Sequence, residues 1–369
     1  MTDAPDSLPS AENSHPRAAM SSDPIGGVES VQLFERVFAG RKSTLLAISG
    51  GADSTALLVL VGEWAQTGRA PKIAVATVDH GLRAEAKEEA AAVKALAERF
   101  GLPFTLLDAK GEPRDTKIEE TARVLRYGAL LAHAKSIRAD SIATAHTLDD
   151  QAETVLMRLS KGSGPMGLAA MRHAVRREGI ELLRPLLSVP KARLVATLNA
   201  RRIGWAEDAM NHDPRFTRAR LRAAREALES EGLTAERLGT LAFRMARVNA
   251  AIEAAIDDAQ KVHVTRQDDQ SIIAATSAKL PDEIKLRLLG RLIGKIGGVR
   301  VKLDKLERLA DRIVTQASGA ATLADARIAW GQDGVIAISP APPRKAKTDA
   351  KTDAKTKSGK GSAKGGGKA

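Results

Sequence analysis

Residues 45–58 read LLAISGGADSTALL, and this stretch decides the fold of the chain around it. A short apolar run leads into two glycines and small hydroxyl residues, and a second, helix-like apolar run follows. Gly50 and Gly51 permit backbone conformations that other residues avoid and let the backbone approach a ligand closely. The amides of the loop and of the first helical turn can then bind an anion, aided by the helix dipole. The stretch predicts a strand, an anion-binding loop and a helix, with an ordinary glycine turn as the alternative.

Two common phosphate-binding patterns do not fit this loop. The Walker pattern places Gly-Lys-Ser/Thr at the helix start, where this chain has Gly51, Ala52 and Asp53, and the dinucleotide fingerprint needs glycines where Ala52 and Thr55 stand. The segment SGGADS at 49–54 instead resembles the PP-loop of ATP pyrophosphatases, which split ATP into AMP and pyrophosphate. The resemblance implies an ATP-binding loop made of Ser49, Gly50, Gly51, Ala52, Asp53 and Ser54.

Strand-like and helix-like segments alternate along the first half of the chain. The expected strands are 44–48, 73–78, 103–107 and 141–145, and the expected helices are 55–66, 84–100 and 117–136. Because the strands are almost entirely apolar, the pattern predicts an α/β fold, a parallel sheet with helices on both faces. Ligands bind such sheets at the carboxyl ends of the strands.

The composition predicts five regions. Residues 1–28 form a polar leader expected to be disordered, 29–222 the ATP-binding catalytic domain, 223–262 a helical region, 263–340 a small α+β module, and 341–369 a disordered basic tail. The tail holds nine Lys/Arg and two Asp, which is +7 of the formal charge of +12. Within the helical region we expect a pair of helices with a break at Gly232. Within the module we expect helices at 284–296 and 302–314 and strand-like pieces at 322–330 and 334–339.

The chain contains no cysteine. Disulfides, thiolate metal ligands and sulfur transfer through a protein thiol are therefore excluded. No apolar run is long enough to cross a membrane, and the leader lacks the apolar core of a signal peptide. We expect a cytoplasmic protein that does not associate with a membrane.

The segment HTLDDQAET at 146–154 starts at an expected strand end and continues into a helix. Asp149 and Asp150 either cap that helix or, near a triphosphate and Asp53, hold Mg²⁺ or bind an ammonium group. His146 is a candidate contact to phosphate, although a strand-end histidine with a structural role is the alternative.

Three other segments supply candidate contacts to nucleotide or substrate. These are Asp79, His80 and Arg83 in DHGLR, Arg123 and Arg126 beside Tyr127, and Lys161 at the base of a glycine-rich loop. The alternatives are a plain strand-to-helix turn, a solvated helix face and a simple connector.

Six motifs occur in a fixed order along the chain. They are SGGADS (49–54), VDHGLR (78–83), ARVLRY (122–127), TAHTLDDQAET (144–154), RPLL (184–187) and EDAMNHD (207–213). In this order they resemble the tRNA(Ile)-lysidine synthetase family over roughly residues 43–222. The chain departs from the family pattern at Ala219, where Asn is usual, and at Lys161, where Arg is common.

The resemblance implies an enzyme that uses ATP and Mg²⁺ to adenylate the wobble cytidine of a tRNA(Ile) with a CAU anticodon. Free L-lysine then attacks C2 of that base and displaces AMP, and the product, lysidine, switches decoding from AUG to AUA. The implied residues for catalysis, Mg²⁺ or lysine are Asp53, His146, Asp149, Asp150 and Glu153. Residues 223–262 would contact the tRNA, and the family suggests a homodimer.

The absence of cysteine argues against the relatives that share the loop. Sulfur-inserting tRNA enzymes generally work through cysteines, and asparagine and GMP synthetases use a cysteine-dependent glutaminase. An ammonia-dependent amide synthetase and a non-catalytic RNA-binding protein remain as alternatives.

Overall fold

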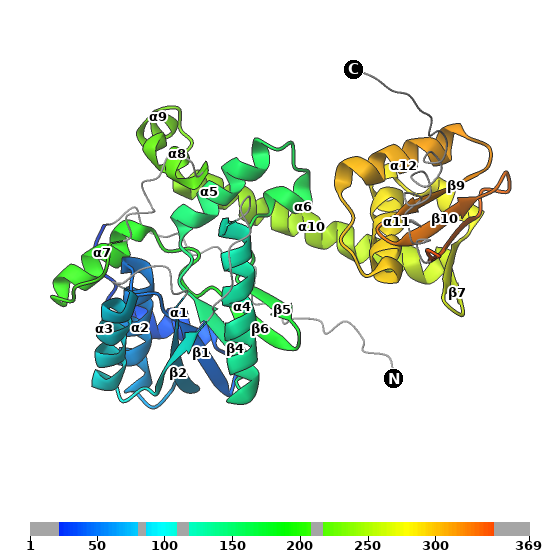
Figure 1. The fold of residues 1–369 in the computed structure, drawn as a ribbon. Coiled ribbons are helices and arrows are strands. Elements are labelled where there is room, and N and C mark those ends of the chain that lie inside the picture. The colour runs from blue at the N-terminus through cyan, green and yellow to red at the C-terminus, as the bar shows by residue number, and fades with distance from the viewer. Residues whose placement is uncertain (1–21, 80–85, 109–117, 208–216, 343–369) are drawn as a thin grey trace, which may run out of the picture. The chain divides into compact units, whose positions relative to one another are not determined.

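The computed structural model describes residues 22–79, 86–108, 118–207 and 217–342. The chain forms two compact units, Met1–Ala250 and Ala251–Ala369 (Figure 1). The candidate residues His80 and Arg83 lie outside the described residues, as does nearly all of the basic tail. None of the described helices is long and apolar enough to cross a membrane.

A six-stranded sheet in the order β3-β2-β1-β4-β6-β5 forms the centre of the first unit. Its strands are β1 (Ser43–Ala47), β2 (Lys72–Asp79), β3 (Phe104–Asp108), β4 (Ser141–Thr144), β5 (Ala174–Arg177) and β6 (Ile180–Leu183). The predicted parallel sheet is confirmed, since all neighbours except β5 pair in parallel. The apolar pattern does not predict the hairpin of β5 and β6. Its tight turn, Glu178–Gly179, has positive φ angles at both residues and places β5 as an antiparallel edge strand beside β6.

Helices cover both faces of this sheet, as the sequence predicts. One face carries α1 (Gly27–Val37), α2 (Ala52–Ala65), α3 (Ala86–Arg99) and α7 (Lys191–Ala200), and the other carries α4 (Ile118–Ser136). The alternation of β1 sets this division, because Leu46 packs in the core beneath α2 whereas Leu45 packs against Tyr127 of α4. Figure 1 shows α2 and α3 on one side of the sheet and α4 on the other.

The predicted disordered leader is wrong for residues 22–28, which are part of the fold. Ile25 is 1% exposed, and its amide donates a hydrogen bond of 2.9 Å to Thr197 Oγ1. Arg193 binds both carboxylate oxygens of Glu29 at 2.6 and 2.7 Å. A single apolar side chain thus anchors a polar segment, which composition averaged over the leader does not show.

The rest of the first unit is helical. It consists of α5 (Leu148–Leu159), α6 (Pro165–Leu168), α8 (Thr217–Ala223), α9 (Arg225–Ser230) and α10 (Ala235–His263), which continues into the second unit. The predicted helix break at Gly232 is confirmed, because this glycine has φ +79° between α9 and α10. Leu148 and Val155 of α5 pack against Leu238 of α10.

The second unit combines α11 (Asp282–Gly297) and α12 (Leu303–Thr315) with an antiparallel sheet in the order β7-β8-β11-β10-β9. The strands are β7 (Val264–Gln267), β8 (Gln270–Ile273), β9 (Gly319–Leu323), β10 (Ala326–Trp330) and β11 (Ile336–Pro340). The strand-like piece expected at 322–330 is two strands joined by the tight turn Ala324–Asp325, where both φ angles are positive. The β7–β8 hairpin is a further element that the sequence analysis does not predict.

Candidate functional site

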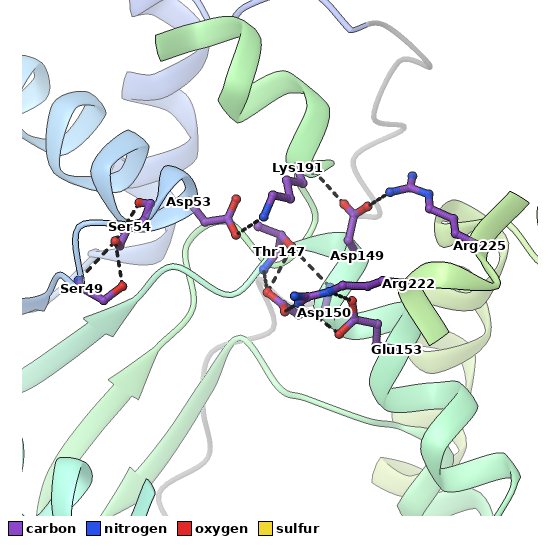
Figure 2. Close-up of polar contacts among 11 residues, drawn as sticks. Ser49, Asp53, Ser54, Thr147, Asp149, Asp150, Glu153, Lys191, Arg222 and Arg225 are labelled. Atoms are coloured by element: carbon purple, nitrogen blue, oxygen red, sulfur yellow. Dashed lines mark hydrogen bonds and ion pairs between the residues drawn. The ribbon is translucent and has the colours of Figure 1, made fainter. Parts of the chain in front are cut away.

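The loop after β1 has the geometry of an anion site. Gly50 adopts φ +89°, and Gly51 precedes α2 without contributing a side-chain cap. The side chain of Ser54 closes the loop, accepting a hydrogen bond from the Ser49 amide (3.2 Å) and donating one to the Gly51 carbonyl (3.0 Å) (Figure 2). Because the first amides of a helix have no acceptor within it, the start of α2 offers donors to an anion.

Asp53 lies in the first turn of α2, beside this loop. Its Oδ2 is 3.4 Å from Lys191 Nζ, while its Oδ1 is buried without a hydrogen-bond partner among the described residues. Burial raises the pKa of Asp53 to about 6; the ammonium of Lys191 opposes this shift, and Asp150 and Asp149 add to it. The carboxyl is therefore mainly ionised at neutral pH, and its buried Oδ1 has neither a hydrogen bond nor an ion pair among the described residues.

The next two acids lie in the first turn of α5, after β4, and different groups bind them. Asp150 forms a capping box with Thr147, whose amide donates to Asp150 Oδ2 at 2.9 Å. The capping interpretation therefore applies to Asp150. Asp149 accepts a hydrogen bond from the Lys191 amide (2.7 Å) and one from Arg225 Nη1 (2.6 Å). Figure 2 shows Asp53, Asp149 and Asp150 around Lys191.

Glu153 is buried one turn further along α5. Arg222 Nε donates to its Oε1 at 2.6 Å, and Arg218 Nε is 3.9 Å from its Oε2. Burial raises the pKa of Glu153, although the hydrogen bond from Arg222 opposes the shift. Both arginines lie on α8, so this helix brings positive charge to the acids of α5.

His146 lies at the end of β4, and its Nδ1 is 2.9 Å from Thr144 Oγ1. Burial lowers the pKa of His146 to about 4; the nearby Asp150 opposes the shift, and Arg184, Arg123 and Arg218 add to it. The imidazole is therefore neutral at neutral pH. It can donate or accept a hydrogen bond but supplies no positive charge.

The remaining predicted contacts are dispersed. Asp79 ends β2 and is half-buried. Arg123 and Arg126 lie beside the ring of Tyr127 on α4, with guanidinium carbons 4.9 and 5.7 Å from its centroid. Lys161 is exposed in the turn after α5, and in the described part of the chain its side chain makes no hydrogen bond to the loop or the acids. The structure therefore does not bring Lys161 into contact with the site.

Three cations at the site are absent from the sequence-based candidates. Lys191, Arg222 and Arg225 each bind an acid from a segment 69 to 138 residues away in the chain. The sequence contains signals for two of them: the motif RPLL is followed shortly by Lys191, and the strongly basic run RARLR at 218–222 includes Arg222. Neither signal reveals which acid each cation meets.

The described residues include no group of three or more His, Asp or Glu side chains arranged to hold a metal ion. The buried, unpartnered Oδ1 of Asp53 nevertheless fits one ligand position of a hard cation, which prefers carboxylate oxygen. Mg²⁺ usually takes its remaining ligands from water and substrate phosphates.

The comparisons with known proteins agree with this geometry. A family model described as a PP-loop domain matches residues 28–226. The tRNA(Ile)-lysidine synthase of Bradyrhizobium diazoefficiens is 43% identical over 359 residues, covering 89% of this chain and 99% of the relative. That of Rhodopseudomonas palustris is 44% identical over 330 residues, covering 85% and 95%.

Among solved structures, the U34-tRNA thiolase NcsA from Methanococcus maripaludis matches with a TM-score of 0.50 at 16% identity, covering 59% of this chain and 78% of that one. At this identity the likeness shows a shared fold. The sequence matches extend through nearly the whole length of the relatives. The chain therefore belongs to the tRNA(Ile)-lysidine synthase family.

Proposed function

We propose that this protein joins free L-lysine to C2 of the wobble cytidine in a tRNA(Ile) with a CAU anticodon, using ATP and Mg²⁺. The observation that carries the proposal is the meeting of a PP-loop with an incompletely paired carboxylate, Asp53, at one edge of the sheet. The relatives are tRNA(Ile)-lysidine synthases, which supports the tRNA substrate. A tRNA substrate also favours a cytoplasmic location, and the homodimer stays a prediction.

The first step would transfer AMP to the base. The cytidine O2 attacks the α-phosphorus of ATP, a P–O bond to the β-phosphate breaks, and pyrophosphate leaves. The amides at the start of α2 and the hydroxyl of Ser49 would hold the pyrophosphate, while Ser54, which donates to the Gly51 carbonyl, would keep the loop closed. Mg²⁺ would supply charge neutralisation on the phosphates, and Asp53 is the residue that fits it, with Asp149 as a second acid nearby.

The second step would form the new C–N bond. The ε-amine of lysine attacks C2, the C2–O bond breaks, and AMP leaves with that oxygen. Lysine arrives as an ammonium group, so a base must remove a proton before the amine can attack.

Asp53 would hold Mg²⁺ in the first step only, and in the second step its free oxygen is the one best suited to receive this ammonium group. Asp150 is held in a capping box, and Glu153 is bound by Arg222. Asp149 is bound by the Lys191 amide and by Arg225. Asp53 alone of these acids combines a buried free oxygen with a pKa raised to about 6, and it already holds the ammonium of Lys191.

The test incubates purified protein with ATP, Mg²⁺, labelled lysine and transcripts of tRNA(Ile) carrying CAU. We expect label in the tRNA with one AMP and one pyrophosphate released per lysine. Ammonia in place of lysine tests the amide synthetase alternative, and tRNA(Met) with the same anticodon tests selectivity. Binding of tRNA without any ATP-dependent transfer, in a folded preparation, would favour the non-catalytic RNA-binding protein instead.

A further inference from the structure

Arginine side chains from two elements surround the ring of Tyr127. The guanidinium carbon of Arg123 lies 4.9 Å from the ring centroid, that of Arg126 5.7 Å and that of Arg177 5.6 Å. Arg123 and Arg126 belong to α4, whereas Arg177 ends the edge strand β5. Tyr127 itself is buried in the core beneath α4, which fixes the position of its ring.

A fourth guanidinium belongs to the same group. Arg184 follows β6 and is 7% exposed; its Nη1 donates to the Arg172 carbonyl at 2.6 Å, but its Nε is buried without a partner among the described residues. Burial lowers the pKa of Arg184, and the charges of Arg123 and Arg177 lower it further. We call Arg123, Arg126, Arg177 and Arg184 the arginine cluster.

The arginine cluster lacks negative charge of its own. Within the part of the chain that the structure describes, none of its members forms an ion pair or hydrogen bond with a carboxylate. The arginines of the neighbouring site differ in this respect, because Arg222 binds Glu153 and Arg225 binds Asp149. Buried charges in proteins are normally paired, and Arg184 is buried with an unpartnered Nε, so the arginine cluster is suited to an anion that comes from outside the chain.

The extent of the arginine cluster favours a polymer over a single small anion. Its members reach from Arg184, after β6, to Arg177 on the edge strand, and Arg123 and Arg177 are exposed. The cluster also borders the catalytic edge, because Arg184 directly follows Leu183, whose carbonyl accepts a hydrogen bond from Thr144 Oγ1 at 3.3 Å, and the same hydroxyl lies 2.9 Å from His146 Nδ1. The phosphates of ATP have a separate place at the PP-loop.

We propose that the arginine cluster binds backbone phosphates of the tRNA next to the nucleotide that is modified. This inference rests on the proposed function for the identity of the RNA. Guanidinium groups bind phosphate oxygens through two parallel hydrogen bonds, and the ring of Tyr127 keeps three of them at fixed positions. Phosphate contacts of this kind fix the register of the RNA without reading its sequence.

The test uses the double variant Arg123→Gln/Arg177→Gln, because both side chains are exposed and their loss leaves the core intact. Arg99→Gln is the matched control, an exposed arginine in the last turn of α3. Arg99 is separated from the arginine cluster because α3 covers the opposite face of the sheet from α4 and Tyr127. Binding of dye-labelled tRNA is followed by anisotropy without ATP or lysine, over a series of KCl concentrations.

We expect the double variant to bind tRNA about 10- to 100-fold more weakly at low salt, with a slope of log K against log [KCl] reduced by about 1 to 2. The control should match the wild type, and ATP affinity should be unchanged in both. Unchanged tRNA affinity and slope in the double variant would overturn the proposal. Loss of ATP affinity with unaltered tRNA binding would do so as well, and would assign the cluster to the nucleotide.

This assay is independent of turnover, which separates the two proposals. If the wild type forms no lysidine while the double variant loses tRNA binding, the proposed function fails and the arginine cluster remains an RNA site. If the wild type forms lysidine and the double variant binds tRNA normally, the proposed function stands and the arginine cluster is not an RNA site. The single variant Arg177→Gln should show the same change at smaller size and provides the answer if the double variant does not fold.

Discussion

The ammonium of Lys191 and the carboxylate of Asp53 form a one-sided pair, because Nζ contacts Oδ2 at 3.4 Å and leaves Oδ1 buried without a partner among the described residues. The backbone amide of the same lysine binds Asp149 at 2.7 Å. One residue at the start of α7 therefore contacts an acid of the PP-loop and an acid of α5. Lys191 therefore links the two segments, and its substitution should change the pKa of Asp53.

Asp53→Asn should stabilise the ligand-free protein while abolishing ATP-dependent lysine transfer. The native pKa of about 6 lies above the ordinary value of 3.8, so the folded state retains the proton that the unfolded state has lost. The free energy of unfolding therefore falls as pH rises from about 4 to 6. Above pH 6 the native carboxyl is ionised, and the full destabilisation from burying its charge is present. Urea denaturation should show the variant about 1–3 kcal/mol more stable at pH 7.5 and equal to the wild type below pH 4.

The control for this experiment is Asp304→Asn. Asp304 also lies in the first turn of a helix, α12, but its side chain is 62% exposed and pairs with Arg308 at the surface. Its removal should change stability by less than about 1 kcal/mol at either pH. An Asp53→Asn variant that is less stable than the wild type at pH 7.5 would contradict the claim that burying the ionised Asp53 carboxylate destabilises the native protein.

Lys191→Met should raise the pKa of Asp53 above its present value, because the ammonium currently holds it down. The acidic limb of the pH–rate profile should move to higher pH, and lysine transfer at pH 7 should fall about 10- to 100-fold. Lys191→Arg keeps the charge and should retain most of the activity. A profile in Lys191→Met that keeps the wild-type midpoint would show that Asp53 does not control this limb.

Arg222→Met should destabilise the protein by about 2–4 kcal/mol at pH 7, because it leaves the buried carboxylate of Glu153 without its main partner. Arg225→Met breaks the pair with Asp149, but that arginine is 55% exposed, and the loss should stay below about 1 kcal/mol. The double variant Arg222→Met/Glu153→Leu should recover part of the lost stability. The losses are measured from denaturant midpoints. Equal losses of stability in Arg222→Met and Arg225→Met would contradict the predicted difference between the buried and the exposed pair.

His146 should remain neutral in the native protein down to about pH 4, because burial lowers its pKa to that value from 6.5. The folded state then binds fewer protons than the unfolded state, so the stability that this group contributes is present above pH 6.5 and is lost as pH falls towards 4. His146→Gln should lack this loss, which a comparison of urea midpoints at pH 7 and pH 4.5 detects. Titration of the His146 ring by NMR with a midpoint near 6.5 would contradict the prediction.

Much of the fold follows from local patterns. The predicted strand at 44–48 is β1 with a shift of one residue, and the helix break at Gly232 is where the break was expected. Local patterns do not predict an element whose position depends on packing against another part of the chain. Ile25 packs only because α7 lies beside it, and β5 pairs only because β6 offers an edge.

The sequence by itself determined the PP-loop and the family, because Ser49 to Ser54 are contiguous and their backbone geometry depends on glycine and helix-start rules that act over a few residues. The tertiary structure alone decided which acid keeps a free oxygen. Asp53, Asp149 and Glu153 look equivalent in the sequence, but cations 138, 76 and 69 residues away bind them in different ways. Electrostatic energy depends on distance in space and on burial, and folding determines both.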